Sequence, residues 1–183
     1  AVNNYTKGKY AKAEKYFKRS AELDPENNSY YFKYGVSLYK NEKFNNALVI
    51  LKLAKAEGSE LIEKEYYMGL THFRLNEYDK ALEKFTYCTD KKHPVISPSA
   101  AFYQGIILFT LEKYEAAKKP FEFVLDTSKD PKMDNKAEEF LEKIANIQRF
   151  KRLQEKKNDI SGTFGLSYDS NVLQASDTSI NQG

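Results

Sequence analysis

A repeat of 34 to 36 residues constrains this chain more than any other feature of its sequence. Four segments share an aromatic residue, an alanine three positions later and a large apolar residue four positions further on. The aromatic residues are Tyr10, Phe44, Tyr78 and Tyr114, separated by 34, 34 and 36 residues. A near-constant period of this length indicates stacked helical units, because one such unit cannot bury its apolar face alone.

A second pattern precedes three of the four aromatic residues. It is centred on a glycine, at Gly35, Gly69 and Gly105. We predict that each glycine segment forms the first helix of a two-helix unit and that the aromatic residue opens the second helix. Small residues then let the two helices approach, and large residues fill the remaining gaps.

This pattern resembles the tetratricopeptide repeat family over residues 1–129, including the "LDP" sequence at 23–25. The resemblance implies an all-α fold, a right-handed solenoid of helix hairpins with about four second helices. The first repeat is expected to begin partway through its first helix, so that the array would continue upstream. Pro120 departs from the family pattern and predicts a kink, because proline removes a backbone hydrogen bond inside a helix.

One further helical pattern covers residues 130–158. Asp130 is a suitable N-cap and Pro131 a suitable first helical residue. Apolar residues follow at helical spacing, at Ala137, Phe140, Leu141, Ile144 and Ile147. We predict a long capping helix that closes the solenoid.

The end of this predicted helix is basic, at Arg149, Lys151, Arg152, Lys156 and Lys157. The dipole of a helix favours cations near its C-terminus, which is the simpler explanation. A contact with anionic lipid headgroups is the alternative.

No residues combine into a recognisable catalytic or metal site. The two histidines, His72 and His93, do not form a pair at ligand spacing, and Cys88 occupies a small-residue packing position. The net charge of +3 is spread over interspersed acidic and basic residues, which argues against a nucleic-acid partner. We therefore expect no enzyme activity, no cofactor and no bound metal.

The predicted binding surface is the concave face built by the first helices. Members of the family typically bind extended peptides or helices there, and in this chain the face is aromatic and aliphatic. Its predicted residues are Phe32, Val36, Tyr39, Tyr66, Leu70, Phe73, Phe102, Ile106 and Phe109. The alternative is that neighbouring helices already cover much of it. Lys40 and Arg74 are expected only at its rim, which disfavours a receptor for the C-terminal carboxylates of chaperones.

Residues 159–183 change to a period of two. Apolar residues and a glycine, including Phe164, Leu166 and Tyr168, alternate with small or polar ones, which predicts a strand. The stretch "GTFGLSYDSNV" resembles the opening strand of Gram-negative outer-membrane proteins that carry periplasmic tetratricopeptide domains before a C-terminal barrel. A lone strand needs a partner for its backbone groups. We therefore expect this tail to dock into a concave groove or to mediate self-association by pairing with another copy.

Together these patterns predict a non-catalytic scaffold that binds protein or peptide segments. The tail resemblance implies the periplasmic domain of an outer-membrane export or assembly protein, for surface polysaccharide, surface protein or lipoprotein. Its contact with the outer membrane would run through a barrel that follows this sequence. The alternative is a soluble intracellular co-chaperone or complex-assembly adaptor in the cytoplasm, in which the tail is a linker.

Overall fold

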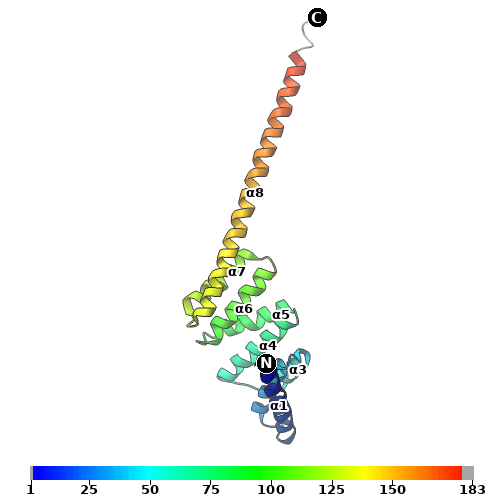
Figure 1. Ribbon diagram of the computed structural model, residues 1–183, viewed down its shortest axis with the longest axis vertical. Helices are drawn as coiled ribbons and strands as arrows, with labels where there is room; N and C mark the ends of the chain where they lie inside the picture. Colours follow the sequence, from blue (N-terminus) through cyan, green and yellow to red (C-terminus); the bar gives the residue numbers. More distant parts are fainter. Residues whose placement is uncertain (1, 179–183) are drawn as a thin grey trace. The chain divides into compact units, whose positions relative to one another are not determined.

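The computed structural model describes the backbone of residues 2–178 and the side chains of residues 9–158 other than Asn28. Every regular element in that part of the chain is an α-helix, which confirms the all-α prediction (Figure 1). The helices are α1 Val2–Leu23, α2 Asn28–Lys40, α3 Phe44–Leu53, α4 Gly58–Arg74, α5 Tyr78–Asp90, α6 Ile96–Thr110, α7 Tyr114–Thr127 and α8 Pro131–Thr178. The chain divides into two compact units, residues 1–139 and 140–183, which are described separately.

The first unit is an array of helix hairpins. Helices α3, α5 and α7 begin at Phe44, Tyr78 and Tyr114, the aromatic residues predicted to open the second helix of each repeat. Within each repeat α2 packs on α3, α4 on α5 and α6 on α7. The first helices also contact one another in order, α2 with α4 and α4 with α6. The solenoid arrangement is therefore confirmed.

The repeat glycines allow the two helices of a hairpin to touch. A Cβ atom added at Gly69 would lie 2.7 Å from Phe85 Cε1, and one added at Gly105 would lie 2.6 Å from Phe121 Cε1. Both phenylalanine side chains are fully buried. The alternation of glycine on the first helix and a large ring on the second therefore sets the distance between the helices.

The turn inside each hairpin uses a left-handed residue that is not glycine. These residues are Glu42, Asn76 and Glu112, with φ of 62°, 59° and 56°. In each turn the next backbone N–H donates to a carbonyl five residues back, as from Glu77 to His72 at 2.9 Å. This pattern satisfies carbonyl groups that the end of a helix leaves open. The same turn recurs at the repeat period and fixes the geometry of each hairpin.

The first helix differs from the prediction. We expected the first repeat to begin partway through its first helix, with the second helix opening at Tyr10. Instead α1 is continuous from Val2 to Leu23 and passes through Tyr10. A continuous helix keeps the backbone groups of residues 2–9 within one hydrogen-bond ladder, whereas a turn would open that ladder.

Helix α7 runs through Pro120 without interruption, and the kink expected there stays a prediction. Helix α8 begins at Pro131, as predicted. Asp130 Oδ1 accepts a hydrogen bond from the Lys132 backbone N–H at 3.0 Å, which is the expected N-cap interaction. That α8 caps the solenoid also stays a prediction.

The predicted strand is wrong for the residues that the structure describes. Helix α8 continues to Thr178, so the backbone around Phe164, Leu166 and Tyr168 is helical. A helix bonds its own N–H and C=O groups, whereas a lone strand must find another strand. The side chains of this stretch, and residues 179–183 altogether, lie outside the described part, so the docking of the tail stays a prediction.

Candidate protein-binding surface on the first helices

Five aromatic side chains form a continuous row across three successive first helices. Tyr39 comes from α2, Tyr66, Tyr67 and Phe73 from α4, and Tyr103 from α6, and we call this set the aromatic row. The ring centroids of Tyr39 and Tyr67 lie 5.7 Å apart, and those of Tyr66 and Tyr103 lie 6.4 Å apart. The ring centroids of Phe73 and Tyr103 lie 5.3 Å apart, with an interplanar angle of 65°. Edge-to-face contacts of this kind are favourable for aromatic pairs, so the row joins neighbouring repeats.

The row is half-buried. Its five side chains pack against the core clusters with one side and remain partly exposed with the other. Burial raises the pKa of the Tyr39, Tyr66, Tyr67 and Tyr103 hydroxyls above the ordinary tyrosine value. These phenols therefore stay protonated at physiological pH and offer hydrogen-bond donors beside apolar rings.

Two cations extend over aromatic rings, one over rings of the row and the other over a ring outside it. Lys40 Nζ lies 5.8 Å from the ring centroids of both Tyr39 and Tyr67. Arg74 Cζ lies 4.7 Å from the ring centroid of Phe44. Both residues are exposed and were expected at the rim of the surface. A cation over a ring face is attracted by the ring quadrupole, so positive charge borders the row.

A recess of about 320 Å³ lies at the α6 end of the row. Aromatic rings from α4 and α6 line it together with residues at the start of α8. The charged residues of the lining are two lysines, Lys132 and Lys136, and one carboxylate, Asp130. The Oδ1 atom of Asp130 already accepts the hydrogen bond that caps α8. The full lining is Tyr66, Ser99, Phe102, Tyr103, Asp130, Lys132, Met133 and Lys136. The recess therefore combines an apolar wall with net positive charge.

The residues predicted for the binding surface divide into two groups. Phe32 and Leu70 are each 7% exposed and belong to the core clusters. The others are half-buried, at Val36, Tyr39, Tyr66, Phe73, Phe102, Ile106 and Phe109. Their role in binding stays a prediction, and the half-buried group has the accessible surface that binding requires.

Sequence reasoning missed Tyr67 and Tyr103, which link the other rings of the row. A signal was present, since both tyrosines stand two residues before a repeat glycine, at Gly69 and Gly105. The corresponding position of the second repeat holds Lys33, which breaks the pattern. A comparison of repeats position by position would therefore have found them.

The histidines and the cysteine have structural contacts. His72 is buried, and its Nδ1 lies 2.5 Å from Glu77 Oε2. Cys88 is fully buried, its Sγ donates to the Ile62 carbonyl at 3.5 Å, and burial raises the pKa of the thiol to about 12. The imidazole Nδ1 of His93 accepts a hydrogen bond from the Ile96 N–H at 3.2 Å in the loop before α6.

Among the residues that the structure describes, no group of three or more His, Cys, Asp and Glu side chains is arranged to hold a metal ion. No helix in the same part of the chain combines the length and apolar character needed to cross a membrane.

Comparison with known proteins agrees with this geometry. Residues 6–88 match the model of the family described as anaphase-promoting complex, cyclosome, subunit 3. A crystal structure of a tetratricopeptide repeat protein from Parabacteroides merdae ATCC 43184 is similar with a TM-score of 0.63 and 20% sequence identity. The similarity covers 76% of this chain and 55% of that one, so this chain spans little more than half of that structure. No curated protein matches the chain. The repeat period, the glycine-to-ring packing and this structural likeness show that the chain has the fold of tetratricopeptide repeat proteins.

Proposed function

We propose that the chain is a non-catalytic scaffold that binds a segment of another protein along the aromatic row and in the recess beside it. The tetratricopeptide fold is generally a protein-interaction scaffold, which supports the general role. The single observation that carries the location is the half-buried row of five rings shared by α2, α4 and α6. Exposed ring edges on one continuous surface suit the apolar side chains of an incoming segment.

The charges around the row define the kind of segment. Lys40 and Arg74 border its α2 and α4 parts, and Lys132 and Lys136 border the recess. A segment that alternates apolar and acidic side chains would place its rings or aliphatic groups on the row and its carboxylates on these cations. Such complementarity acts on specificity and on the rate of association.

Selection from a library of displayed random peptides tests this proposal. Peptides captured by the chain should be enriched in Asp or Glu together with aromatic or aliphatic residues. A Lys132→Glu/Lys136→Glu variant should lose the acidic preference, and because both lysines are exposed the variant should fold normally. Phe73→Glu, at a member of the row, should abolish capture of the selected peptides.

The matched control is Val49→Glu on the second helix α3, where the side chain is 60% exposed. It adds the same carboxylate at an exposed apolar position outside the row. The proposal fails if Val49→Glu weakens capture as much as Phe73→Glu does. It also fails if the lysine variant keeps the acidic preference with its far-UV circular dichroism spectrum unchanged.

A finer role rests on the sequence alone. We further propose a periplasmic location and a part in outer-membrane export or assembly, supported by the order of a solenoid and a basic helical stretch along the chain. The resemblance of the stretch at 162–172 no longer adds to this support. The helical backbone of that stretch removes the strand on which the resemblance was argued. Fractionation of the producing cells distinguishes the two locations, because a cytosolic protein would favour the intracellular adaptor.

A further inference from the structure

The basic stretch of α8, residues 149–157, needs an explanation other than the helix dipole. It contains five cations and one carboxylate, Glu155. The sequence placed these cations at a helix end, where the dipole would favour them. Helix α8 continues to Thr178, so the stretch lies in the interior of the helix. The dipole acts on charges within the last turn and does not reach this position.

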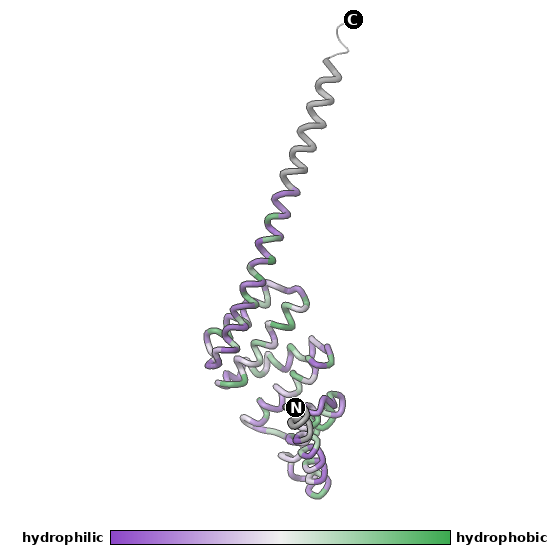
Figure 2. Tube along the Cα trace, in the orientation of Figure 1, coloured by the Kyte–Doolittle hydropathy of each residue, from purple (hydrophilic) through white to green (hydrophobic). Residues whose placement is uncertain are grey.

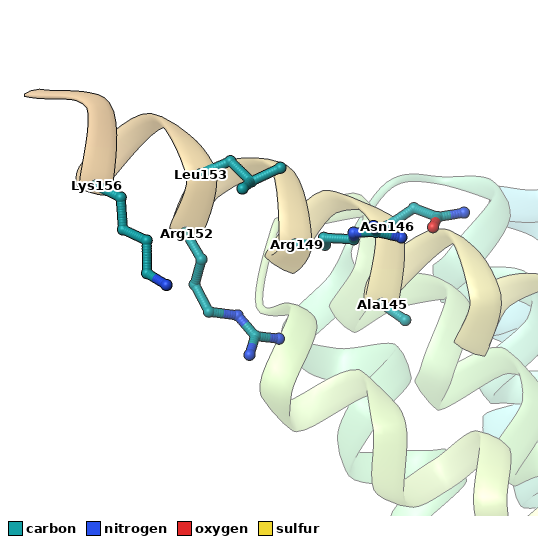
Figure 3. Close-up of a pocket in the computed structure, with 6 residues that line it drawn as sticks. All are labelled: Ala145, Asn146, Arg149, Arg152, Leu153 and Lys156. Carbon is teal, nitrogen blue, oxygen red and sulfur yellow. The ribbon is translucent and has the colours of Figure 1, made fainter.

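Within this unit three of the five cations form a stripe beside two large apolar side chains. Arg149, Arg152 and Lys156 follow at i, i+3 and i+7, which places them on one face of the helix. Figure 3 shows Arg152 and Lys156 pointing to one side of α8 and Leu153 to another. Phe150 is 61% and Leu153 57% exposed, beside the cationic face. Figure 2 shows the same part of α8 as mainly hydrophilic with isolated hydrophobic positions.

The spacing of the cations opposes the helix that carries them. Arg149 with Arg152 and Arg152 with Lys156 are like-charged pairs at i, i+3 and i, i+4, and such pairs destabilise a helix. Arg152 Nε contacts the Gln148 backbone carbonyl at 3.4 Å, a neutral partner that leaves this repulsion in place. The three side chains also line an open recess of about 480 Å³ on the helix surface, together with Ala145, Asn146 and Leu153. A negatively charged surface would relieve the repulsion.

We infer that residues 146–158 of α8 lie along an anionic phospholipid surface. The two exposed apolar side chains favour lipid over nucleic acid or an acidic protein, because Phe150 and Leu153 can enter the boundary between headgroups and acyl chains. The long arginine and lysine side chains beside them then reach the phosphates. The apolar stripe is short and interrupted by charges, so the helix would lie on the membrane rather than across it.

The experiment measures co-flotation of the whole 183-residue chain with vesicles. One vesicle type is phosphatidylcholine alone, and the other contains about one-third phosphatidylglycerol. Binding should appear with the anionic vesicles and weaken as salt is raised. Each cation near such a surface contributes roughly fivefold, so Arg149→Glu/Arg152→Glu/Lys156→Glu should reduce binding by more than about 100-fold. Phe150→Ser/Leu153→Ser, which keeps the charge, should reduce it by about tenfold.

The control is Lys52→Glu/Lys55→Glu/Lys129→Glu, which makes the same change in net charge at exposed positions of the other unit. It should bind anionic vesicles within about threefold of the unchanged chain. The inference is overturned if this control loses binding as fully as the α8 triple variant. It is also overturned if the serine variant binds like the unchanged chain, or if duplex DNA or polyglutamate binds this stretch while the anionic vesicles do not.

Discussion

The close approach of α4 and α5 at Gly69 allows a test in which the packing decides whether a substitution stabilises or destabilises the chain. In Gly69→Ala the new Cβ would lie 2.7 Å from Phe85 Cε1 and 2.9 Å from Cδ1. Carbon atoms in contact prefer about 3.5–4.0 Å, so the ring must move by about 1 Å. The Phe85 side chain is fully buried. Its ring stacks on Tyr103 with the ring centroids 5.5 Å apart, and its centroid lies 5.9 Å from that of Tyr66. The ring therefore has little room to move.

Two opposing effects decide the outcome. Overpacking a buried site costs about 1–3 kcal/mol. Replacing glycine by alanine inside a helix stabilises the helix by about 1 kcal/mol, because alanine has the higher helix propensity. Gly69→Ala should therefore lower the free energy of unfolding by about 1 kcal/mol, with a range of roughly 0–2. Gly35→Ala should destabilise the chain as well, because the added Cβ would lie 2.7 Å from Cδ2 and Cγ of the fully buried Leu51 and 3.2 Å from its backbone nitrogen.

A double-mutant cycle separates the two effects. Phe85→Leu alone should cost about 1–2 kcal/mol through the cavity it creates. Gly69→Ala in that background should then stabilise by up to about 1 kcal/mol, because the ring is gone and only propensity remains. Urea unfolding followed by circular dichroism measures all four proteins. If Gly69→Ala stabilises the original chain as much as the Phe85→Leu chain, the proposed contact does not limit the packing.

Three further predictions concern single residues. Because burial raises the pKa of Cys88 to about 12, its thiol should react with an aromatic disulfide reagent at pH 8 only after denaturation, and rapid reaction of the native chain would contradict the packing. Hydrogen bonds to His72, and to a smaller extent to Lys80, lower the pKa of the Glu77 carboxyl. The ionised carboxylate therefore stabilises the fold fully above the ordinary pKa of 4.5, and this stabilisation is lost as pH falls through the lowered pKa. Glu77→Gln should therefore destabilise the chain in urea at pH 7, and the difference should disappear as pH falls below the lowered pKa of Glu77. Glu112→Gly should stabilise the chain by about 1 kcal/mol because φ is 56°, whereas Asn76→Gly should change the unfolding free energy less, since asparagine tolerates the left-handed region.

The fold could be predicted where the signal is local and repeated. The starts of α3, α5, α7 and α8 follow from one aromatic residue or cap each, at Phe44, Tyr78, Tyr114 and Asp130. The turns between paired helices carried no such signal, because their left-handed positions hold glutamate or asparagine instead of glycine. Their conformation is imposed by the two helices that they join.

The binding surface was harder to predict than the fold. Phe32 and Tyr66 stand at the same position of their repeats. Phe32 lies three residues before Gly35, and Tyr66 lies three residues before Gly69. Yet Phe32 is 7% exposed and Tyr66 is half-buried. Phe32 packs with Leu51 and Ala54 of its own repeat and with Met68 of the next repeat, and this last contact is one that the spacing within a helix does not specify. Exposure on a solenoid therefore depends on contacts between repeats, which the period of one helix does not specify.

The stretch at 160–168 shows how a short pattern supports two structures. Ile160, Phe164 and Tyr168 fit alternation, but they also recur every four residues, which is a helical spacing. Helix α8 passes through Gly162 and Gly165, and each glycine costs a helix about 1 kcal/mol relative to alanine. Gly162→Ala/Gly165→Ala should therefore raise the helical signal at 222 nm and strengthen helical Cα chemical shifts over 160–168 in the full chain.

A strand would respond differently to the same change. Its Cα shifts would lie on the extended side, and the two alanines would leave the signal at 222 nm unchanged or lower. Because an extended segment must find a partner for its backbone groups, those shifts would also depend on protein concentration if the partner were a second copy. Helical shifts that do not depend on concentration and strengthen in the alanine variant would show that the chain itself supplies the hydrogen bonds of this stretch. Cα chemical shifts on the extended side that change with protein concentration would instead support the paired strand that the alternating pattern predicted.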